Sequence, residues 1–482
     1  MNKHQMFGYL TQNIGIMRQA SDKIWDYAET AFEEFQSSEL IKNILSERGF
    51  DVESGTGGID TAFCATFGEG GPVVGILAEY DALSGLSQKA GLAVRDAATP
   101  GGNGHGCGHN LFAGASLGAA IAVREYLASN KLRGTVKLFG CPGEEGGSGK
   151  AFMAREGVFD VLDAAFAWHP MSVNAILDMS LLANYQVLYK FTGVASHAAS
   201  APDKGRSALD AVELMNVGVN FLREHVIQEA RIHYAITNSG GFSPNVVQPH
   251  AEVLYLIRAP RTSQVEEIYR RVNKIAQGAA LMTETDLEIQ FIKACSNVVP
   301  NKTLSKVLHD NLTIQELPVY TADELKFAGE IAKTSPGAAS ADLNRYLKSH
   351  PADLRECIKR LEGKPMCDIV LPFYHDDPDQ ILAGSSDVGD VSWIAPTAQV
   401  VTACYALGTP EHSWQLVSQG RTSVGHKGML LAARVMAGGA VDLFESPEII
   451  ERAKAELRDR LDGETYRSAI PADVKPVAIG RL

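Results

Sequence analysis

The chain has 482 residues, of which 45% are hydrophobic and 21% are charged, as is ordinary for a soluble globular protein rather than a disordered or fibrous one. Its formal net charge of -13 repels phosphate backbones and anionic membrane surfaces, so we expect neither nucleic acid nor a membrane as a partner. The length exceeds what one hydrophobic core usually supports, and we therefore expect two domains.

The N-terminus and the cysteines indicate the compartment. The first residues, MNKHQMFGYLTQNIGIMRQ, contain no continuous apolar segment of the kind that signal peptides carry. The cysteines are widely spaced and form no CxxC motif, which fits a reducing environment. We expect a cytoplasmic protein.

Residues 21–50 predict two helices. The apolar stripe expected on the first helix consists of Trp25, Ala28, Phe32 and Phe35. A second stripe consists of Leu40, Ile44 and Leu45. Gly49 is expected to close the second helix as its C-terminal cap.

Polar side chains follow several predicted buried strands. Residues 72–78, 135–141 and 164–168 are short apolar segments of the strand type, and a helical pattern at 111–127 lies between the first two. Strands that alternate with helices predict an α/β fold with a mostly parallel sheet flanked by helices, in which sites form beyond the carboxyl ends of the strands. The polar residues at those ends are Asp81, Glu144, Glu145 and His169.

A second unit is expected at residues 184–297. Alternating apolar residues at 185–191 indicate a half-buried strand, and the segment continues in the order β-α-β-β-α-β of ferredoxin-like α+β domains. Ser263 and Glu266 form an SxxE pattern that predicts a capping box on the second helix of this unit. We expect an inserted lid and dimerisation domain here. The catalytic domain then consists of residues 1–183 and 298–482.

The remaining segments complete the first domain. Residues 301–380 are polar and helical in places, and we assign them no chemistry. A strand at 399–407, a loop with His412 and a helix at 423–436 follow. The tail after residue 470 is expected to be an extended surface strap.

The heptad GHGCGHN, at residues 104–110, places Cys107 and His109 between glycines. Side chains two residues apart do not lie on the same face of a helix. The side chains of Cys107 and His109 can therefore converge only from a turn or an extended segment, and the glycines allow such a turn. With His105, the heptad is typical of a metal site, whereas a buried structural cysteine and a structural histidine would give the same letters. The helix predicted after the turn would favour a thiolate through its dipole.

Glu144 and Glu145 are adjacent in a glycine-rich turn at the end of a predicted strand. Like charges side by side raise one pKa unless a cation offsets them. A metal would let one carboxylate bind the ion while the other acts as general base. A solvated surface pair is the alternative interpretation.

Several motifs together resemble the M20 family of metallopeptidases and amidohydrolases, in its aminoacylase-like branch with a cysteine ligand. They are AEYDAL, NGHGCGHN, CPGEEGGSGK, WHP, HYAITNSGG, PNVV, AEVLYLIRAP, GDVSW and HSWQLVSQGRTS. The resemblance covers residues 21–440, with a poor match at 310–380. It implies a zinc-exopeptidase-like catalytic domain with the inserted domain described above.

The resemblance also implies roles for matching residues. Glu144 and Asp81 would be the catalytic residues, with Glu144 as general base and Asp81 supporting a ligand of the metal. The metal ligands would be Cys107, His109, Glu145, His169 and His412. His426 is an alternative to His412, and Glu79 stands where many family members have a histidine ligand, which leaves the coordination of a second metal open.

Three further residues match family positions that hold the substrate. His197 would enter the active site of a neighbouring chain in a dimer, Asn245 would lie at the scissile carbonyl, and Arg258 would bind the substrate carboxylate. Without the resemblance, His197 would be interpreted as a surface turn residue and Arg258 as part of a surface ion pair.

The implied activity is metal-dependent hydrolysis of the amide bond of an N-acyl or N-aroyl amino acid, with p-aminobenzoyl-glutamate as the expected substrate. A general N-acyl-amino-acid deacylase or a dipeptidase is one alternative, and a dependent partner chain with little activity alone is another. The implied cofactor is a pair of divalent metal ions, Mn or Zn, in each chain. The expected assembly is a homodimer or a hetero-oligomer with a related hydrolase subunit.

Overall fold

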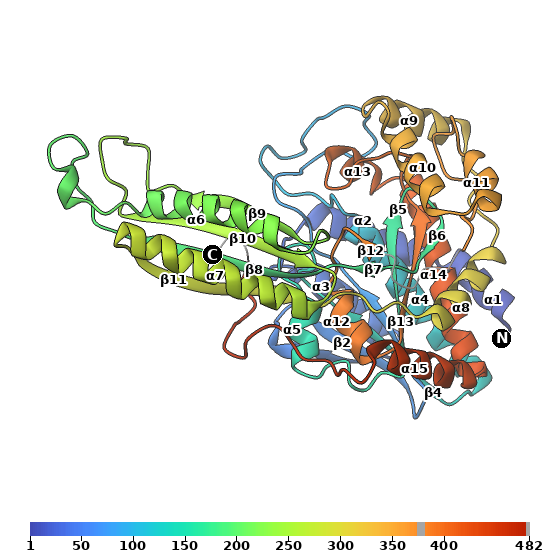
Figure 1. Ribbon diagram of the computed structural model, residues 1–482. Coiled ribbons are helices and arrows are strands. Elements are labelled where there is room, and N and C mark those ends of the chain that lie inside the picture. The colour runs from blue at the N-terminus through green and yellow to red at the C-terminus, as the bar shows by residue number, and fades with distance from the viewer. Residues whose placement is uncertain (374–380, 479–482) are drawn as a thin grey trace.

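The computed structural model describes residues 1–373 and 381–478, apart from the side chains at 345, 346 and 349. It contains a seven-stranded, a four-stranded and a two-stranded sheet. In Figure 1 the four-stranded sheet and its two helices extend to one side of a larger body that surrounds the seven-stranded sheet. This architecture confirms the expected α/β fold class.

The seven-stranded sheet has the order β1-β2-β4-β3-β5-β13-β6. Its strands are β1 (Asp51–Ser54), β2 (Phe63–Glu69), β3 (Val73–Ala78), β4 (Gly134–Gly140), β5 (Ala164–Met171), β6 (Ala175–Leu177) and β13 (Thr397–Ala403). The four central strands, β4, β3, β5 and β13, pair in parallel, and the pairs at both edges are antiparallel. The parallel centre brings the carboxyl ends of four strands to one edge of the sheet.

Helices cover this sheet. They are α1 (Lys3–Gln12), α2 (Ile14–Tyr27), α3 (Phe35–Glu47), α4 (His109–Asn130), α5 (Gly149–Arg155), α12 (Val388–Ile394), α13 (Trp414–Gln419), α14 (Ser423–Glu445) and α15 (Glu448–Leu461). The helix α4 packs against β3, β4 and β5 and against α14. By length and composition α4 could cross a membrane, but 83% of its most apolar stretch is buried inside the protein, as in a core helix.

Within residues 301–380, the described residues are helical in places, as expected. The helices are α8 (Lys302–Thr313), α9 (Ala322–Lys333), α10 (Ala338–Ser349) and α11 (Ala352–Lys359). A two-stranded sheet pairs β7 (Ser180–Leu181) with β12 (Ile381–Leu382). Short 3-10 turns lie at Thr56–Gly58, Pro202–Lys204 and Arg223–His225.

The four-stranded sheet follows the predicted order of elements. These are β8 (Ala183–Thr192), α6 (Ala208–Leu222), β9 (Arg231–Asn238), β10 (His250–Ala259), α7 (Thr262–Thr283) and β11 (Asp286–Cys295). The sheet order is β11-β8-β10-β9 and all pairs are antiparallel. The two helices pack against each other, and Figure 1 shows both on the same face of the sheet. The domain boundaries at 184–297 stay a prediction.

The predicted helical stripe near the N-terminus is wrong beyond Tyr27. The helix α2 ends there because Ala28 has a φ of 44°, and Phe32, with a φ of 63°, lies in the turn before α3. Phe35 is the first residue of α3 and is exposed. Gly49, at a φ of 79°, follows the end of α3 as expected.

Other boundaries also differ from expectation. The helix α7 begins at Thr262, so Ser263 lies inside its first turn, and the side chain of Gln264 accepts a hydrogen bond from the Arg261 N–H at 3.0 Å. The predicted capping box of Ser263 and Glu266 is therefore wrong. The strand β5 continues to Met171, which places His169 within the strand, and β13 ends at Ala403 rather than at residue 407.

Candidate active site

The predicted site residues gather at the carboxyl ends of the central parallel strands. Asp81 lies shortly after β3, Glu144 and Glu145 lie shortly after β4, and His169 lies near the end of β5. The loop that follows β13 carries His412. The sheet topology therefore brings together side chains from segments that are far apart in the sequence.

The glycine turn before α4 places Cys107 beside His109. Gly108 has a φ of 81°, and a Cβ atom added there would lie 1.8 Å from the hydroxyl oxygen of Tyr405. Both the backbone conformation and the lack of space require glycine at this position. Cys107 is half-buried, and His109, the first residue of α4, is fully buried.

Cys107 belongs to two groups of candidate metal ligands. It lies with His109 and His169 in one group, and with Glu145 and His412 in the other. In each group the ligand atoms lie within 4.8 Å of one another. The Sγ atom of Cys107 is 3.4 Å from Nε2 of His169. The other four predicted ligands are thus arranged around the thiol of Cys107.

Asp81 orients His109 and the Glu145 turn at the same time. One of its carboxylate oxygens lies 2.8 Å from Nδ1 of His109, and the other accepts a hydrogen bond from the N–H of Glu145 at 2.9 Å. Burial would raise the pKa of Asp81, but His109 and the N–H donor outweigh it and lower the pKa. Burial would lower the pKa of His109, but Asp81 and Glu79 outweigh it and raise the pKa to about 10.

A buried lysine lies next to these residues. The Nζ atom of Lys150 is 2.6 Å from Glu79 and 2.6 Å from Asp387, and all three side chains are almost completely inaccessible. The backbone N–H of Lys150 also donates to Asp387 at 2.8 Å. The second oxygen of Glu79 lies 3.2 Å from Nε2 of His109, and these two residues form a third group of candidate ligands with Glu144. Glu79 therefore links the lysine to the candidate ligands.

The roles of Lys150 and Asp387 were not predicted from the sequence. Lys150 follows small residues in GSGKAFMA and Asp387 lies in SSDVGDVSW, and neither segment indicates that the two are joined across 237 positions. A lysine within an apolar first turn of a helix indicates a buried acidic partner, because lysine is almost never fully buried unless it is paired. From the sequence, Glu79 was noted only because it stands where many family members have a histidine ligand.

The site contains more buried carboxylates than cations. Burial, and then the charges of Glu79, Asp387 and Glu145, raise the pKa of Glu144 well above its usual range. Burial and the two adjacent glutamates raise the pKa of the Cys107 thiol in the same way, so the expected preference of the helix N-terminus for a thiolate does not prevail in the protein alone. A set of thiol, imidazole and carboxylate donors with surplus negative charge fits divalent metal ions.

The structure separates the two candidates for the last ligand. Nε2 of His412 lies 3.3 Å from Glu145 in the ligand cluster. His426 lies on α14, where its Nε2 is 2.9 Å from Asp22 of α2. His105, the third coordinating residue type of the heptad, has Nε2 2.9 Å from the backbone oxygen of Ile24. Among the described residues, neither His426 nor His105 belongs to a ligand group.

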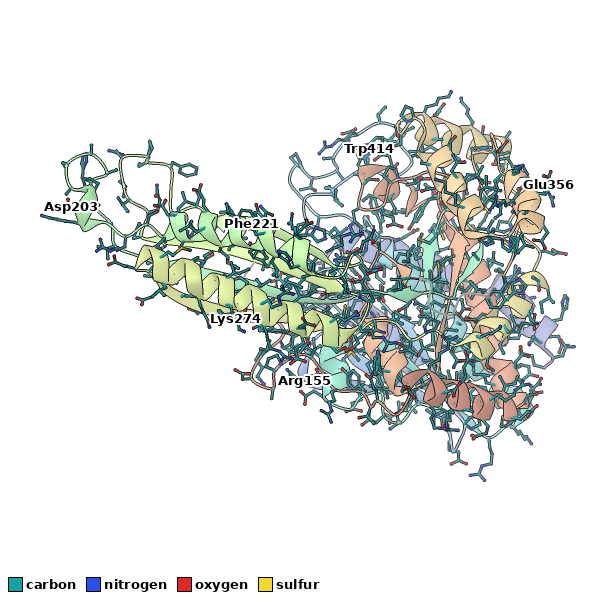
Figure 2. The ribbon with its side chains drawn as sticks, in the orientation of Figure 1. Arg155, Asp203, Phe221, Lys274, Glu356 and Trp414 are labelled. Carbon is teal, nitrogen blue, oxygen red and sulfur yellow. The ribbon has the colours of Figure 1, made fainter. Side chains whose placement is uncertain are left out.

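His197 and Asn245 lie away from the ligand groups. They belong to the β8–α6 and β9–β10 loops, and Figure 2 shows Asp203 of the first loop at the outer end of the four-stranded sheet. His197 is exposed, and the N–H of Ala198 donates to the backbone oxygen of Asn245 at 2.9 Å. His197 and Asn245 therefore lie in two loops that contact each other, away from the ligand groups of the same chain.

Arg258 lies near the inner end of β10, opposite Asn184. One guanidinium nitrogen is 3.3 Å from the hydroxyl of Ser385. Its Nε atom is buried and has no hydrogen-bond partner among the described residues. A planar guanidinium with an unused donor is suited to a carboxylate.

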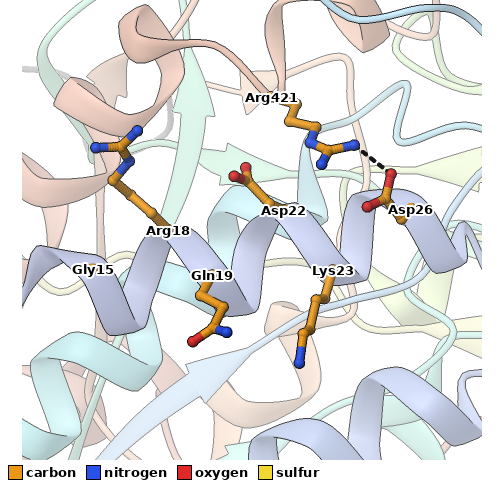
Figure 3. Close-up of a pocket in the computed structure, with 7 residues that line it drawn as sticks. All are labelled: Gly15, Arg18, Gln19, Asp22, Lys23, Asp26 and Arg421. Atoms are coloured by element: carbon orange, nitrogen blue, oxygen red, sulfur yellow. Dashed lines mark hydrogen bonds and ion pairs between the residues drawn. The ribbon is translucent and has the colours of Figure 1, made fainter.

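A separate surface cavity of about 380 Å³ lies along α2 (Figure 3). It is lined by Gly15, Arg18, Gln19, Asp22, Lys23, Asp26 and Arg421. None of the predicted site residues lines it. Arg421 forms an ion pair with Asp26 across its edge. Asp22, another lining residue, pairs with His426 of α14, and we assign the cavity no chemistry.

Comparisons with known proteins show the family of the chain. The model of peptidase family M20/M25/M40 matches residues 75–358. The chain is 50% identical to the subunit designated B of p-aminobenzoyl-glutamate hydrolase from Escherichia coli, covering 95% of each chain. It is 34% identical to human Xaa-Arg dipeptidase, covering 82% of this chain and 75% of the relative. It is 27% identical to the subunit designated A of the E. coli hydrolase, covering 50% and 57%.

Solved structures share the fold. A putative aminohydrolase from methicillin-resistant Staphylococcus aureus matches with a TM-score of 0.63 at 16% identity, covering 92% of this chain and 99% of the other. An aminobenzoyl-glutamate utilization protein from Klebsiella pneumoniae gives 0.59 at 18%, covering 90% and 98%. A Bacillus subtilis protein described as a dinuclear metal-binding peptidase of the M20 family gives 0.55 at 17%, covering 91% and 99%.

Proposed function

Because the chain belongs to peptidase family M20/M25/M40 and is a hydrolase of amide bonds, we propose that it cleaves p-aminobenzoyl-glutamate into p-aminobenzoate and glutamate. The observation that carries this proposal is the cluster of five predicted ligands that includes Cys107, with Glu144 beside it. The E. coli relative at 50% identity is named for hydrolysis of the same compound.

We propose that two divalent ions bind, one to each ligand group that contains Cys107. Cys107, His109 and His169 would hold the first, and Cys107, Glu145 and His412 the second. When bound, such ions supply Lewis-acid activation of water and of the amide carbonyl. The thiol favours Zn, whereas the imidazole and carboxylate donors also suit Mn. Since a thiol ligand has to stay reduced, we also infer a cytoplasmic location.

Glu144 is the proposed general base. Its carboxylate takes a proton from the attacking water and then passes that proton to the nitrogen of the leaving amine. The raised pKa of Glu144 in the protein alone means that burial favours its protonated form, which it needs in the second half of this cycle. Asp81 holds Nδ1 of His109 and the Glu145 N–H, so that both ligands keep their orientation.

Arg258 is the proposed anchor for a carboxylate of the glutamate part of the substrate. It has a buried donor without a partner among the described residues and lies in β10, whose inner end faces the larger body. Bidentate pairing with a carboxylate would satisfy that donor. His197 and Asn245 would complete the site at the scissile carbonyl.

We propose that His197 and Asn245 act in a neighbouring chain, because their own chain keeps them at the outer end of the four-stranded sheet. Exposed apolar residues on that sheet and its first helix support an interface there. They are Leu214, Val217, Phe221, Tyr234 and Ile236. The neighbour would be a second copy of this chain or a related hydrolase subunit, since two E. coli relatives are named as different subunits of p-aminobenzoyl-glutamate hydrolase.

A general deacylase or dipeptidase is the second candidate. The 34% identity to human Xaa-Arg dipeptidase supports it, because that relative is named for cleavage of dipeptides. The two candidates differ in the acyl side of the substrate and share the chemistry of the ligand groups.

The test is a substrate comparison with the purified, metal-loaded protein. Release of glutamate from p-aminobenzoyl-glutamate is measured beside acetyl-amino acids and dipeptides that end in arginine, first with this chain alone and then together with the second E. coli relative. We expect the highest kcat/KM with p-aminobenzoyl-glutamate. A higher value with the arginine dipeptides would favour the second candidate, and activity only in the mixture would show that this chain is a dependent partner.

A further inference from the structure

A buried glutamate that takes no part in the proposed chemistry contacts the turn that carries the general base. Glu34 is fully buried immediately before α3. One of its oxygens accepts a hydrogen bond from the N–H of Gly143 at 2.9 Å, and the other accepts one from the hydroxyl of Thr61 at 2.9 Å. Gly143 directly precedes Glu144, so the contact acts on the backbone next to the base.

The glycines of the same turn pack against the ring of Phe32. This residue has a φ of 63°, a left-handed conformation that is unfavourable for a bulky side chain and persists only when its surroundings require it. A Cβ atom at Gly147 would lie 2.3 Å from the Phe32 ring, and one at Gly143 would lie 2.9 Å from it. The ring therefore fills the space that the glycines of the turn leave open.

Glu34 is also connected to the segment after β3 that carries Asp81. The hydroxyl of Tyr80 donates to the backbone oxygen of Thr61 at 2.6 Å, and Thr61 in turn donates to Glu34. Tyr80 is fully buried and stands between Glu79 and Asp81. One carboxylate thus connects the turn after β4 with the end of β3.

We propose that Glu34 is a positioning residue that fixes the Glu144 turn relative to Asp81 and its histidine. The inference rests on the proposed role of Glu144. A general base has to lie within hydrogen-bond reach of the proton that it abstracts, and small displacements of such groups reduce turnover strongly. Burial and the charge of Asp81 raise the pKa of Glu34 to about 8, so the fold keeps this carboxyl where its charge is disfavoured.

The substitution that tests this is Glu34→Ala, with Glu34→Gln as the rescue. The glutamine amide can accept from the Gly143 N–H with its oxygen and donate to the Thr61 hydroxyl, which can act as acceptor. Glu39→Ala is the matched control, because Glu39 lies on α3 with its side chain 59% exposed in an ion pair with Lys42.

We expect Glu34→Ala to lower kcat about 10- to 100-fold while KM and the metal content stay unchanged. Hydrogen–deuterium exchange should become faster in a peptide that covers residues 141–150 and stay unchanged in peptides from α4 and α14. The Gln variant should restore both kcat and protection, and Glu39→Ala should behave as wild type. The exchange measurement needs no substrate, so it separates this inference from the proposed activity.

Two outcomes would overturn the proposal. One is an Ala variant with wild-type kcat and wild-type exchange at residues 141–150. The other is a Gln variant that loses as much activity as the Ala variant. If Glu34→Ala does not fold, Glu34→Asp takes its place, because it keeps the carboxyl group but is too short by one methylene to hold Gly143. The same two readouts then decide.

Discussion

Asp81 holds Nδ1 of His109 at 2.8 Å, and this contact leaves Nε2 as the ring atom that faces the other candidate ligands. A histidine whose ring is fixed in this way binds metal in one orientation and one tautomer. Asp81 also holds the Glu145 N–H, so one carboxylate orients two of the five candidate ligands.

Asp81→Asn should therefore weaken metal binding about 10- to 100-fold while the fold is retained. The affinity can be measured by competition with a chromogenic chelator. Asp96→Asn is the control, since Asp96 forms an exposed ion pair with Lys89 outside the cluster. An Asp81→Asn protein with wild-type affinity would show that His109 needs no support from this carboxylate.

Cys107→Ser should lower the metal content of the purified protein, because Cys107 is shared by both proposed metal sites and a hydroxyl is a far poorer ligand than a thiolate. Metal per chain is measured by plasma mass spectrometry, and the fold by circular dichroism. Cys141→Ser is the comparison, since Cys141 is buried and, within the described part of the chain, lies outside the ligand groups. Unchanged metal stoichiometry and metal affinity in the Cys107 variant would show that Cys107 is a structural residue and not a metal ligand.

Lys150→Met should lower the free energy of unfolding by about 3–5 kcal/mol, because it leaves Glu79 and Asp387 buried without their cation. Urea unfolding measures the change. Lys42→Met should cost less than about 1 kcal/mol, since its ion pair is exposed on one side. Adding Glu79→Gln and Asp387→Asn to Lys150→Met should recover part of the loss. A Lys150→Met protein as stable as wild type would contradict a structural role for this cation.

The parallel centre of the sheet could be predicted from local patterns in the sequence, whereas the full set of candidate ligands was predicted from the family resemblance. Apolar segments indicated β3, β4 and β5, and the carboxyl ends of parallel strands meet at one edge. The Lys150–Asp387 pair was not predictable in this way, since it joins residues 237 positions apart. The positive φ of Phe32 was also not predictable. The backbone adopts this angle where the ring packs against Gly143 and Gly147, which lie more than 100 residues later in the sequence.

The choice between His412 and His426 shows a similar limit. His412 lies in the loop predicted after the strand at 399–407 and His426 near the start of the helix predicted at 423–436, and spacing alone does not decide which one faces the sheet edge. In the structure, His412 is in the loop before α13 beside Glu145, whereas α14 directs His426 to Asp22. The decision depends on how α14 packs against its neighbours, among them α4, which is a tertiary property.

Mixing experiments test whether the site is completed by a neighbour. Inactive Glu144→Gln chains combined with inactive His197→Ala chains should regain activity, because one site of each mixed dimer then has both residues. Glu144→Gln mixed with Cys107→Ser is the control and should stay inactive, since both changes lie in the same half of the site. If mixed dimers form and no activity returns, His197 acts in its own chain or has no role.

The central claim is that Glu144 is the base and Glu145 a ligand, and the direct measurement compares Glu144→Gln with Glu145→Gln for turnover of p-aminobenzoyl-glutamate and for bound metal. We predict that Glu144→Gln keeps its metal and loses about 10² to 10⁴ in kcat, the usual contribution of a general base, whereas Glu145→Gln loses metal together with activity. A Glu144→Gln protein that loses its metal, or one that turns over at the wild-type rate, would contradict the assignment.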